Sequence, residues 1–172
     1  LRNFLIAILV AIIIILIEPI ILNSIKYFFS TSLETQNLIS TYLSVRVLSA
    51  PAELIIYILV GFYLGIQKTS ISSLLIITLS ILNIIFSSFF VLSMNLNIFG
   101  VALGTLVACY ITVSIFLLFT YNFMVKKFQI IPNFKKIIIP SKLIKLFNIN
   151  FDIFIRTILL TFSFLWITYL SS

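Results

Sequence analysis

The fold is decided by apolar runs such as FLIAILVAIIIILIEPIIL, which extends from Phe4 to Leu22. A bilayer core about 30 Å thick is crossed by about 20 helical residues, so this run is long enough to span a membrane. Lipid offers no water to pair the backbone, and only helices and closed barrels satisfy every backbone polar group there. The many Ile residues therefore do not argue for strands, and we expect a transmembrane helix.

Four further apolar runs reach a similar length. They extend from Leu43 to Ile66, from Ile71 to Ser93, from Ile98 to Phe123 and from Phe151 to Leu170. Of the 172 residues, 62% are apolar and 9% are charged, whereas soluble domains carry about 25% charged residues. The sequence therefore predicts an all-α, polytopic integral membrane helix bundle with about five transmembrane helices, whose first partner is the lipid bilayer.

The composition also excludes several kinds of metal, catalytic and disulfide chemistry. The chain has no His and one Cys, Cys109, which excludes a His-based metal site, a His-dependent triad and an internal disulfide. The apolar runs contain no acid pair and no nucleophile beside a base, so we expect neither an enzyme nor a cofactor. The net charge of +7 comes from basic residues between the runs. This placement is typical of membrane topology and does not indicate a nucleic-acid partner.

The basic residues predict an orientation, because cytoplasmic loops carry the excess of Lys and Arg. If the five spans alternate, one side receives the following eight basic residues: Arg2, Lys68, Lys126, Lys127, Lys135, Lys136, Lys142 and Lys145. Only Lys26 falls in a loop on the other side. We therefore expect a multi-pass protein of the cytoplasmic membrane that starts on the cytoplasmic side.

The four glycines form two GxxxG patterns, Gly61 with Gly65 and Gly100 with Gly104. Small residues four apart let helices approach closely in lipid, so we expect packing contacts here; a role in a transport path is the alternative. Pro51 interrupts the second run and removes a backbone donor, which predicts a kink. The kink could be a static feature or a hinge.

Polar residues inside two runs are the candidate site. Glu53 and Tyr57 share a face of the second run with Gly61 and Gly65, and Arg46 lies two turns before Glu53. Ionisable groups at membrane depth often mark a pathway, although Glu53 could instead form a structural pair with Arg46. In the third run, Asn83 needs partners for its amide that only another helix or a wet cavity provides.

Several motifs carry a family resemblance. The string YLSVRVLSAPAELIIYILVGFYLGIQ, from Tyr42 to Gln67, is similar to the fourth helix of multidrug and toxic compound extrusion (MATE) transporters in their DinF-like branch. It contains Val45-Arg46, Ala50-Pro51-Ala52 and the GxxxGxQ ending from Gly61 to Gln67. Three later strings resemble the fifth, sixth and seventh helices in order: LNIIF at 82–86, GVALGTLVACY at 100–110 and NINFDIFIRT at 148–157.

The resemblance implies a partial MATE-type fold, a fragment that covers helices three to seven of a twelve-helix antiporter. Residues 1–125 would supply four spans of the N-terminal lobe, 126–150 a basic cytoplasmic loop between lobes, and 151–172 the first helix of the C-terminal lobe. The other helices of the full-length chain would be partners. On this basis we predict that these 172 residues alone do not transport.

The resemblance also implies a cation site. Asn83 matches an Asn and Thr105 a Thr of the site found in relatives, but Ser87 stands where an Asp is expected. A Ser cannot exchange a proton near neutral pH or give Na⁺ a full charge. Glu53 is therefore a candidate for a displaced acid, in a site for cation or substrate that would also include Tyr57.

The function implied is a secondary antiporter, driven by Na⁺ or H⁺, that exports small organic or toxic compounds by alternating access. A lipid-linked oligosaccharide flippase of the same superfamily is one alternative, although it would be expected to need several basic residues in its cavity. A membrane scaffold that does not transport is another, with its polar stripes used only for assembly.

Overall fold

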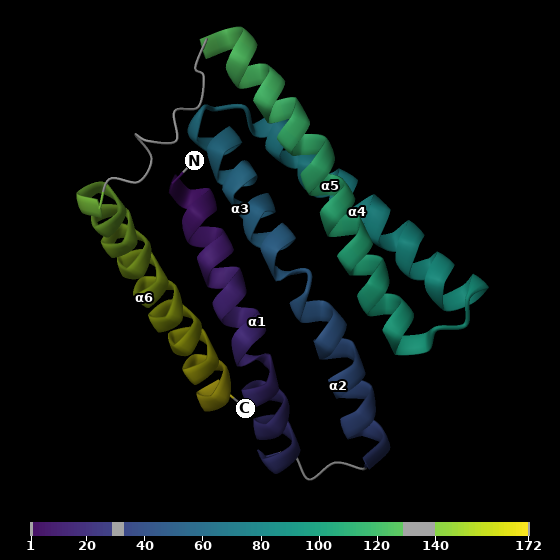
Figure 1. The fold of residues 1–172 in the computed structure, drawn as a ribbon. Helices are drawn as coiled ribbons and strands as arrows, with labels where there is room; N and C mark the ends of the chain where they lie inside the picture. The colour runs from purple at the N-terminus through teal and green to yellow at the C-terminus, as the bar shows by residue number, and fades with distance from the viewer. Residues whose placement is uncertain (1, 29–32, 129–139, 172) are drawn as a thin grey trace. The chain divides into compact units, whose positions relative to one another are not determined.

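The computed structural model describes residues 2–28, 33–128 and 140–171, and these residues form helices joined by short turns, without strands. The elements are α1 (Arg2–Phe28), α2 (Leu33–Val47), α3 (Ala50–Gly65), α4 (Thr69–Ser88), the π-helical turn η1 (Phe89–Ser93), α5 (Asn97–Phe128) and α6 (Pro140–Ser171) (Figure 1). The predicted all-α class is confirmed. The chain divides into two compact units, one holding α1 to α5 and the other α6.

Four helical stretches in the described residues are long and apolar enough to cross a membrane. They are Arg2–Ser24, Thr69–Ser93, Asn97–Val125 and Leu146–Thr168. A fifth candidate is the pair α2 and α3, which meet at an angle of 52° and pass the same test together. The expectation of about five transmembrane helices is therefore confirmed, and the protein is a multi-pass membrane protein.

Helical structure extends into both ends of the connector expected over residues 126–150. Helix α5 continues to Phe128, and α6 begins at Pro140. Proline suits a helix start because the first turn needs no backbone donor from it. The middle of the connector, 129–139, lies outside the described residues. The domain boundaries and the orientation deduced from the lysines stay predictions, because the side chains of Lys126, Lys127, Lys135, Lys136, Lys142 and Lys145 also lie outside them.

Helices α4 and α5 lie side by side and make the most extensive helix contact of the first unit (Figure 1). A Cβ added to Gly104 on α5 would come within 2.5 Å of the backbone N and Cα of Ser87 on α4, and one added to Gly100 within 3.1 Å of the Phe90 carbonyl carbon. Only glycine leaves room for this approach. The second GxxxG pattern is thus where the two backbones nearly touch.

The first GxxxG pattern behaves differently. A Cβ added to Gly61 or Gly65 on α3 would have no heavy atom of the described residues within 4 Å. Their expected packing role finds no partner in this part of the chain and stays a prediction. The same sequence pattern therefore marks a tight contact on α5 and an open face on α3.

The core of the first unit lies between α3, α4 and α5. Its buried cluster consists of Ala52, Ile56, Leu59, Leu75, Cys109, Val113 and Phe116. Tyr63, fully buried, reaches from α3 to α5, where its hydroxyl lies 2.7 Å from Thr120 Oγ1. Outside this cluster, large apolar side chains such as Leu16, Ile84 and Leu118 are exposed, as expected for helices whose solvent is lipid.

We expect Gly104→Ala to destabilise the protein and Gly61→Ala to leave it nearly unchanged. The added methyl at position 104 forces α4 and α5 apart, at a cost of about 1–3 kcal/mol for overpacking. At position 61 the methyl has room, and Ala is the better helix former. Thermal unfolding of the purified protein in detergent would measure both, and equal melting temperatures for the two variants would contradict the close contact.

Candidate functional site

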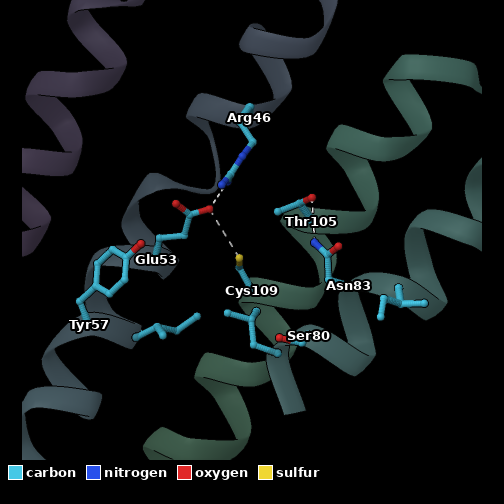
Figure 2. Close-up of a pocket in the computed structure, with 10 residues that line it drawn as sticks. Arg46, Glu53, Tyr57, Ser80, Asn83, Thr105 and Cys109 are labelled. Atoms are coloured by element: carbon cyan, nitrogen blue, oxygen red, sulfur yellow. Dashed lines mark hydrogen bonds and ion pairs between the residues drawn. The ribbon is translucent and has the colours of Figure 1, made fainter. Parts of the chain in front are cut away.

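A pocket of about 370 Å³ opens where the end of α2 meets α3, α4 and α5 (Figure 2). Its lining consists of Arg46, Glu53, Ile56, Tyr57, Leu79, Ser80, Asn83, Ile84, Thr105 and Cys109. Four of the five residues that the sequence proposed for a cation or substrate site lie around it: Glu53, Tyr57, Asn83 and Thr105. Residues 52 positions apart in the chain thus share one polar recess in an apolar bundle.

The pocket forms at a break in the helix. Leu48 and Ser49 form a turn between α2 and α3, with the Leu48 N–H donating to the Val45 carbonyl and the Ser49 N–H to that of Arg46. Pro51 then lies in the first turn of α3, where its missing N–H costs nothing. The predicted kink is present as a 52° bend. It lies before the proline because the Pro51 ring clashes with the carbonyl four residues earlier and cannot donate to it, and this carbonyl belongs to Val47, the last residue of α2.

An ion pair bridges this break. The Arg46 guanidinium, from the last turn of α2, contacts Oε1 of Glu53 in the first turn of α3. The buried Ser49 hydroxyl lies 2.9 Å from the same oxygen and 2.6 Å from the Arg46 carbonyl oxygen, and also accepts from the guanidinium. The Arg46 and Glu53 side chains stay 31% and 23% exposed. The structural pairing that the sequence offered as one alternative is therefore present, on the wall of the pocket.

Helix α5 contacts both sides of the break. The thiol of Cys109 lies 3.7 Å from Glu53 Oε1, and the Tyr110 hydroxyl donates to the Leu48 carbonyl at 3.1 Å. This carbonyl belongs to the turn and needs a partner inside the membrane. Neither residue belongs to the site predicted from the sequence, although Cys109 follows Thr105 by one helical turn and so shares its face.

Asn83 both joins two helices and faces the pocket. Its Nδ2 donates to Thr105 Oγ1 at 2.9 Å, from α4 to α5, and the Thr105 hydroxyl donates to the Val101 carbonyl at 3.1 Å. Both residues also line the pocket (Figure 2). The two interpretations of Asn83 are therefore compatible, since one amide supplies the helix contact and the polar wall.

Ser87 is not part of the pocket lining. It packs against Gly104, and its buried hydroxyl has no hydrogen-bond partner among the described residues. Ser80 does line the pocket, but its hydroxyl donates to the Ile76 carbonyl in its own helix. In the described part of the chain no three His, Cys, Asp or Glu residues gather as a metal site would require.

The charges of the lining cancel. Arg46 and Glu53 are its two ionisable residues of opposite charge, and they face each other. Tyr57 lies one turn after Glu53 and is 66% exposed, so its ring forms an open wall next to the carboxylate (Figure 2). The pocket therefore offers a paired carboxylate, an amide with a hydroxyl, and apolar walls from Ile56, Leu79 and Ile84.

Comparison with known proteins found relatives in bacteria. The chain is 34% identical over 131 residues to DNA damage-inducible protein F of Escherichia coli, and 30% and 33% identical over 129 and 132 residues to multidrug export protein MepA of Staphylococcus saprophyticus and Staphylococcus aureus. These matches cover 76%, 74% and 76% of this chain but 28% of each relative. No family model and no solved structure gives a significant match.

Replacing Thr105 tests the hydrogen bond between α4 and α5. Thr105→Val keeps the shape but removes the acceptor of the Asn83 amide, and we expect a loss of about 1 kcal/mol, the usual range for such bonds between membrane helices. Thr105→Ser keeps the hydroxyl and should be less destabilising. The comparison is made by heating the purified variants in detergent, and a valine variant as stable as the serine variant would count against this bond.

Proposed function

Because this chain belongs to the multidrug and toxic compound extrusion (MATE) family, in its DinF-like branch, we propose that it contributes helices to a transporter that exports organic compounds across the cytoplasmic membrane. The relatives named multidrug export proteins support this activity. The observation that carries the proposal is the pocket at the helix break, where polar groups of α2 to α5 meet. Such recesses at membrane depth are typical of substrate paths.

The proposed mechanism is alternating access, driven by an inward gradient of Na⁺ or H⁺. Discontinuous helices in membranes are characteristic of transporter binding sites, because their interrupted backbone lines a cavity. The break between α2 and α3 is such an interruption. The MATE-type cation site assigned from the motifs would use Asn83 and Thr105, which here supply neutral oxygens on one wall of the pocket.

Glu53 is the proposed acid of this site. Ser87 packs outside the pocket lining and has no charge to offer, whereas the Glu53 carboxylate lines the pocket. Tyr57 beside it would add a ring face for the cargo. We therefore assign Glu53 the negative charge that a cationic cargo or the coupling cation requires, with Asn83 and Thr105 as neutral partners.

Two other functions fit the pocket less well. A flippase for phosphate-linked oligosaccharides would need several basic residues to hold its cargo, and the pocket lining has one, Arg46, whose charge is compensated by Glu53. A scaffold would have no need of an open polar pocket. The MepA relatives are named for export and not for an enzymatic reaction, which supports a transporter.

Efflux measurements on cells that express the complete gene test the proposal. Wild type should lower the accumulation of the fluorescent cation ethidium, and Glu53→Gln should reduce the efflux rate about tenfold, equivalent to about 1.4 kcal/mol. Glu34→Gln is the matched control, because Glu34 lies exposed in the first turn of α2, outside the pocket lining. Imposed Na⁺ and pH gradients would identify the coupling ion. A wild type without efflux would favour a scaffold, and full, coupled efflux by Glu53→Gln would remove Glu53 from the mechanism.

We also expect that the 172 residues alone, reconstituted in vesicles, do not transport. Alternating access requires two helix groups that rock against each other around the site, and the matched stretch spans 28% of each relative's length. The measurement is uptake of ethidium into vesicles containing the chain, beside vesicles with the complete gene product. Uptake by the chain alone would overturn the two-lobed mechanism.

A further inference from the structure

We propose that Arg46 competes with the cargo for the cation-binding carboxylate. The Arg46 guanidinium pairs with Glu53, and a lipophilic organic cation binds in the pocket by displacing this guanidinium. This inference rests on the proposed function and adds how cargo reaches the site. It starts from the position of the pair. Both side chains line the same pocket, and their contact is part of its wall (Figure 2).

The two oxygens of the Glu53 carboxylate have different surroundings. The Oε1 atom is contacted by Arg46, by the Ser49 hydroxyl at 2.9 Å and by the Cys109 thiol at 3.7 Å. No hydrogen bond from the described residues reaches Oε2. Since a carboxylate can accept several hydrogen bonds, an incoming cation can approach at Oε2 while Arg46 still holds Oε1. Exchange of one cation for the other then needs no intermediate with a bare buried charge.

The Arg46 guanidinium can leave the Glu53 carboxylate at low cost. Its side chain is 31% exposed, and ion pairs with such access to solvent are weak, with contributions of about 0–1 kcal/mol. Two cations on one carboxylate repel each other, so binding of the second favours release of the first. The arginine stem is long and flexible, and its head can move toward a more polar environment while the stem stays on apolar surface.

The side chains that line the pocket indicate what the uncharged part of the ligand should be. Tyr57 presents an exposed ring one turn from the carboxylate, and aromatic faces attract cations. Ile56, Leu79 and Ile84 supply apolar surface. A monovalent cation with a bulky apolar body therefore matches the pocket, because its charge replaces that of Arg46 and its body covers the apolar walls. An anion of the same shape would have to separate Glu53 from Arg46 and meet the carboxylate's repulsion.

Equilibrium binding of tetraphenylphosphonium to the purified full-length gene product tests this inference. Relative to wild type, we expect Arg46→Gln to bind this cation about fivefold more tightly, since the competitor is gone and an exposed pair contributes up to about 1 kcal/mol. Glu53→Gln should bind it about tenfold more weakly, and Arg46→Gln combined with Glu53→Gln should resemble Glu53→Gln. Arg46→Lys should bind with an affinity between those of wild type and Arg46→Gln, because a compact ammonium holds the carboxylate through fewer bonds.

Tetraphenylborate, with the same shape and the opposite charge, is the matched ligand. If the cargo cation displaces Arg46, Arg46→Gln should not strengthen the binding of tetraphenylborate. Tetraphenylphosphonium binding that is equal or weaker in both Arg46→Gln and Arg46→Lys than in wild type would overturn the competitor role, even if Glu53→Gln still lowers it. Tighter binding of tetraphenylborate to wild type, lost in Arg46→Gln, would overturn the cation assignment. Absence of ethidium efflux by wild type would instead remove the proposed function on which the inference rests.

Discussion

A hydrocarbon solvent leaves every backbone polar group to find its partner inside the protein, and this constraint explains where the candidate site lies. Along α4 and α5, which contain no proline, the helical hydrogen bonds satisfy these groups. Between α2 and α3 they cannot, because Pro51 has no N–H to donate. The turn at Leu48 and Ser49 meets the demand with short-range backbone bonds and with the Tyr110 hydroxyl. Two of the polar side chains at the break, Ser49 and Tyr110, thus bond carbonyls of the interrupted backbone.

The contact between Gly104 and Ser87 brings the two halves of the site together. With no Cβ at position 104, α5 lies directly on the backbone of α4, and Thr105 comes within hydrogen-bond distance of Asn83. One turn further along the same face, Cys109 meets Glu53. A packing feature that involves no ligand group thus fixes which residues of α5 face the pocket.

Much of this arrangement could be predicted from the sequence, because span length and the Pro51 kink follow from local rules. Local rules could not predict which helix packs against each helix face. Both GxxxG patterns look alike, yet Gly104 packs on Ser87 and Gly61 meets none of the described residues. Ser87 is a candidate for the same site as Asn83 in the sequence, but it packs against Gly104 on α5 and does not line the pocket. The π-helical turn Phe89–Ser93 and the early start of α2 at Leu33 also depend on context that local patterns do not encode.

The family resemblance implies an acid at position 87, where this chain has Ser87, and the chain instead carries Glu53 in the pocket lining. A carboxylate at position 87 would press against the α5 backbone at Gly104, where charge is costly to bury without a partner. At position 53 the carboxylate faces Arg46, so the pair is neutral as a unit. Because both side chains stay partly exposed, solvent can compensate part of the charge that remains when one member leaves. A monovalent cation that takes the place of the guanidinium keeps the Glu53 carboxylate paired, while the partly exposed Arg46 head can move toward a more polar environment. A cation is therefore the ligand that this pair can accommodate at least electrostatic cost.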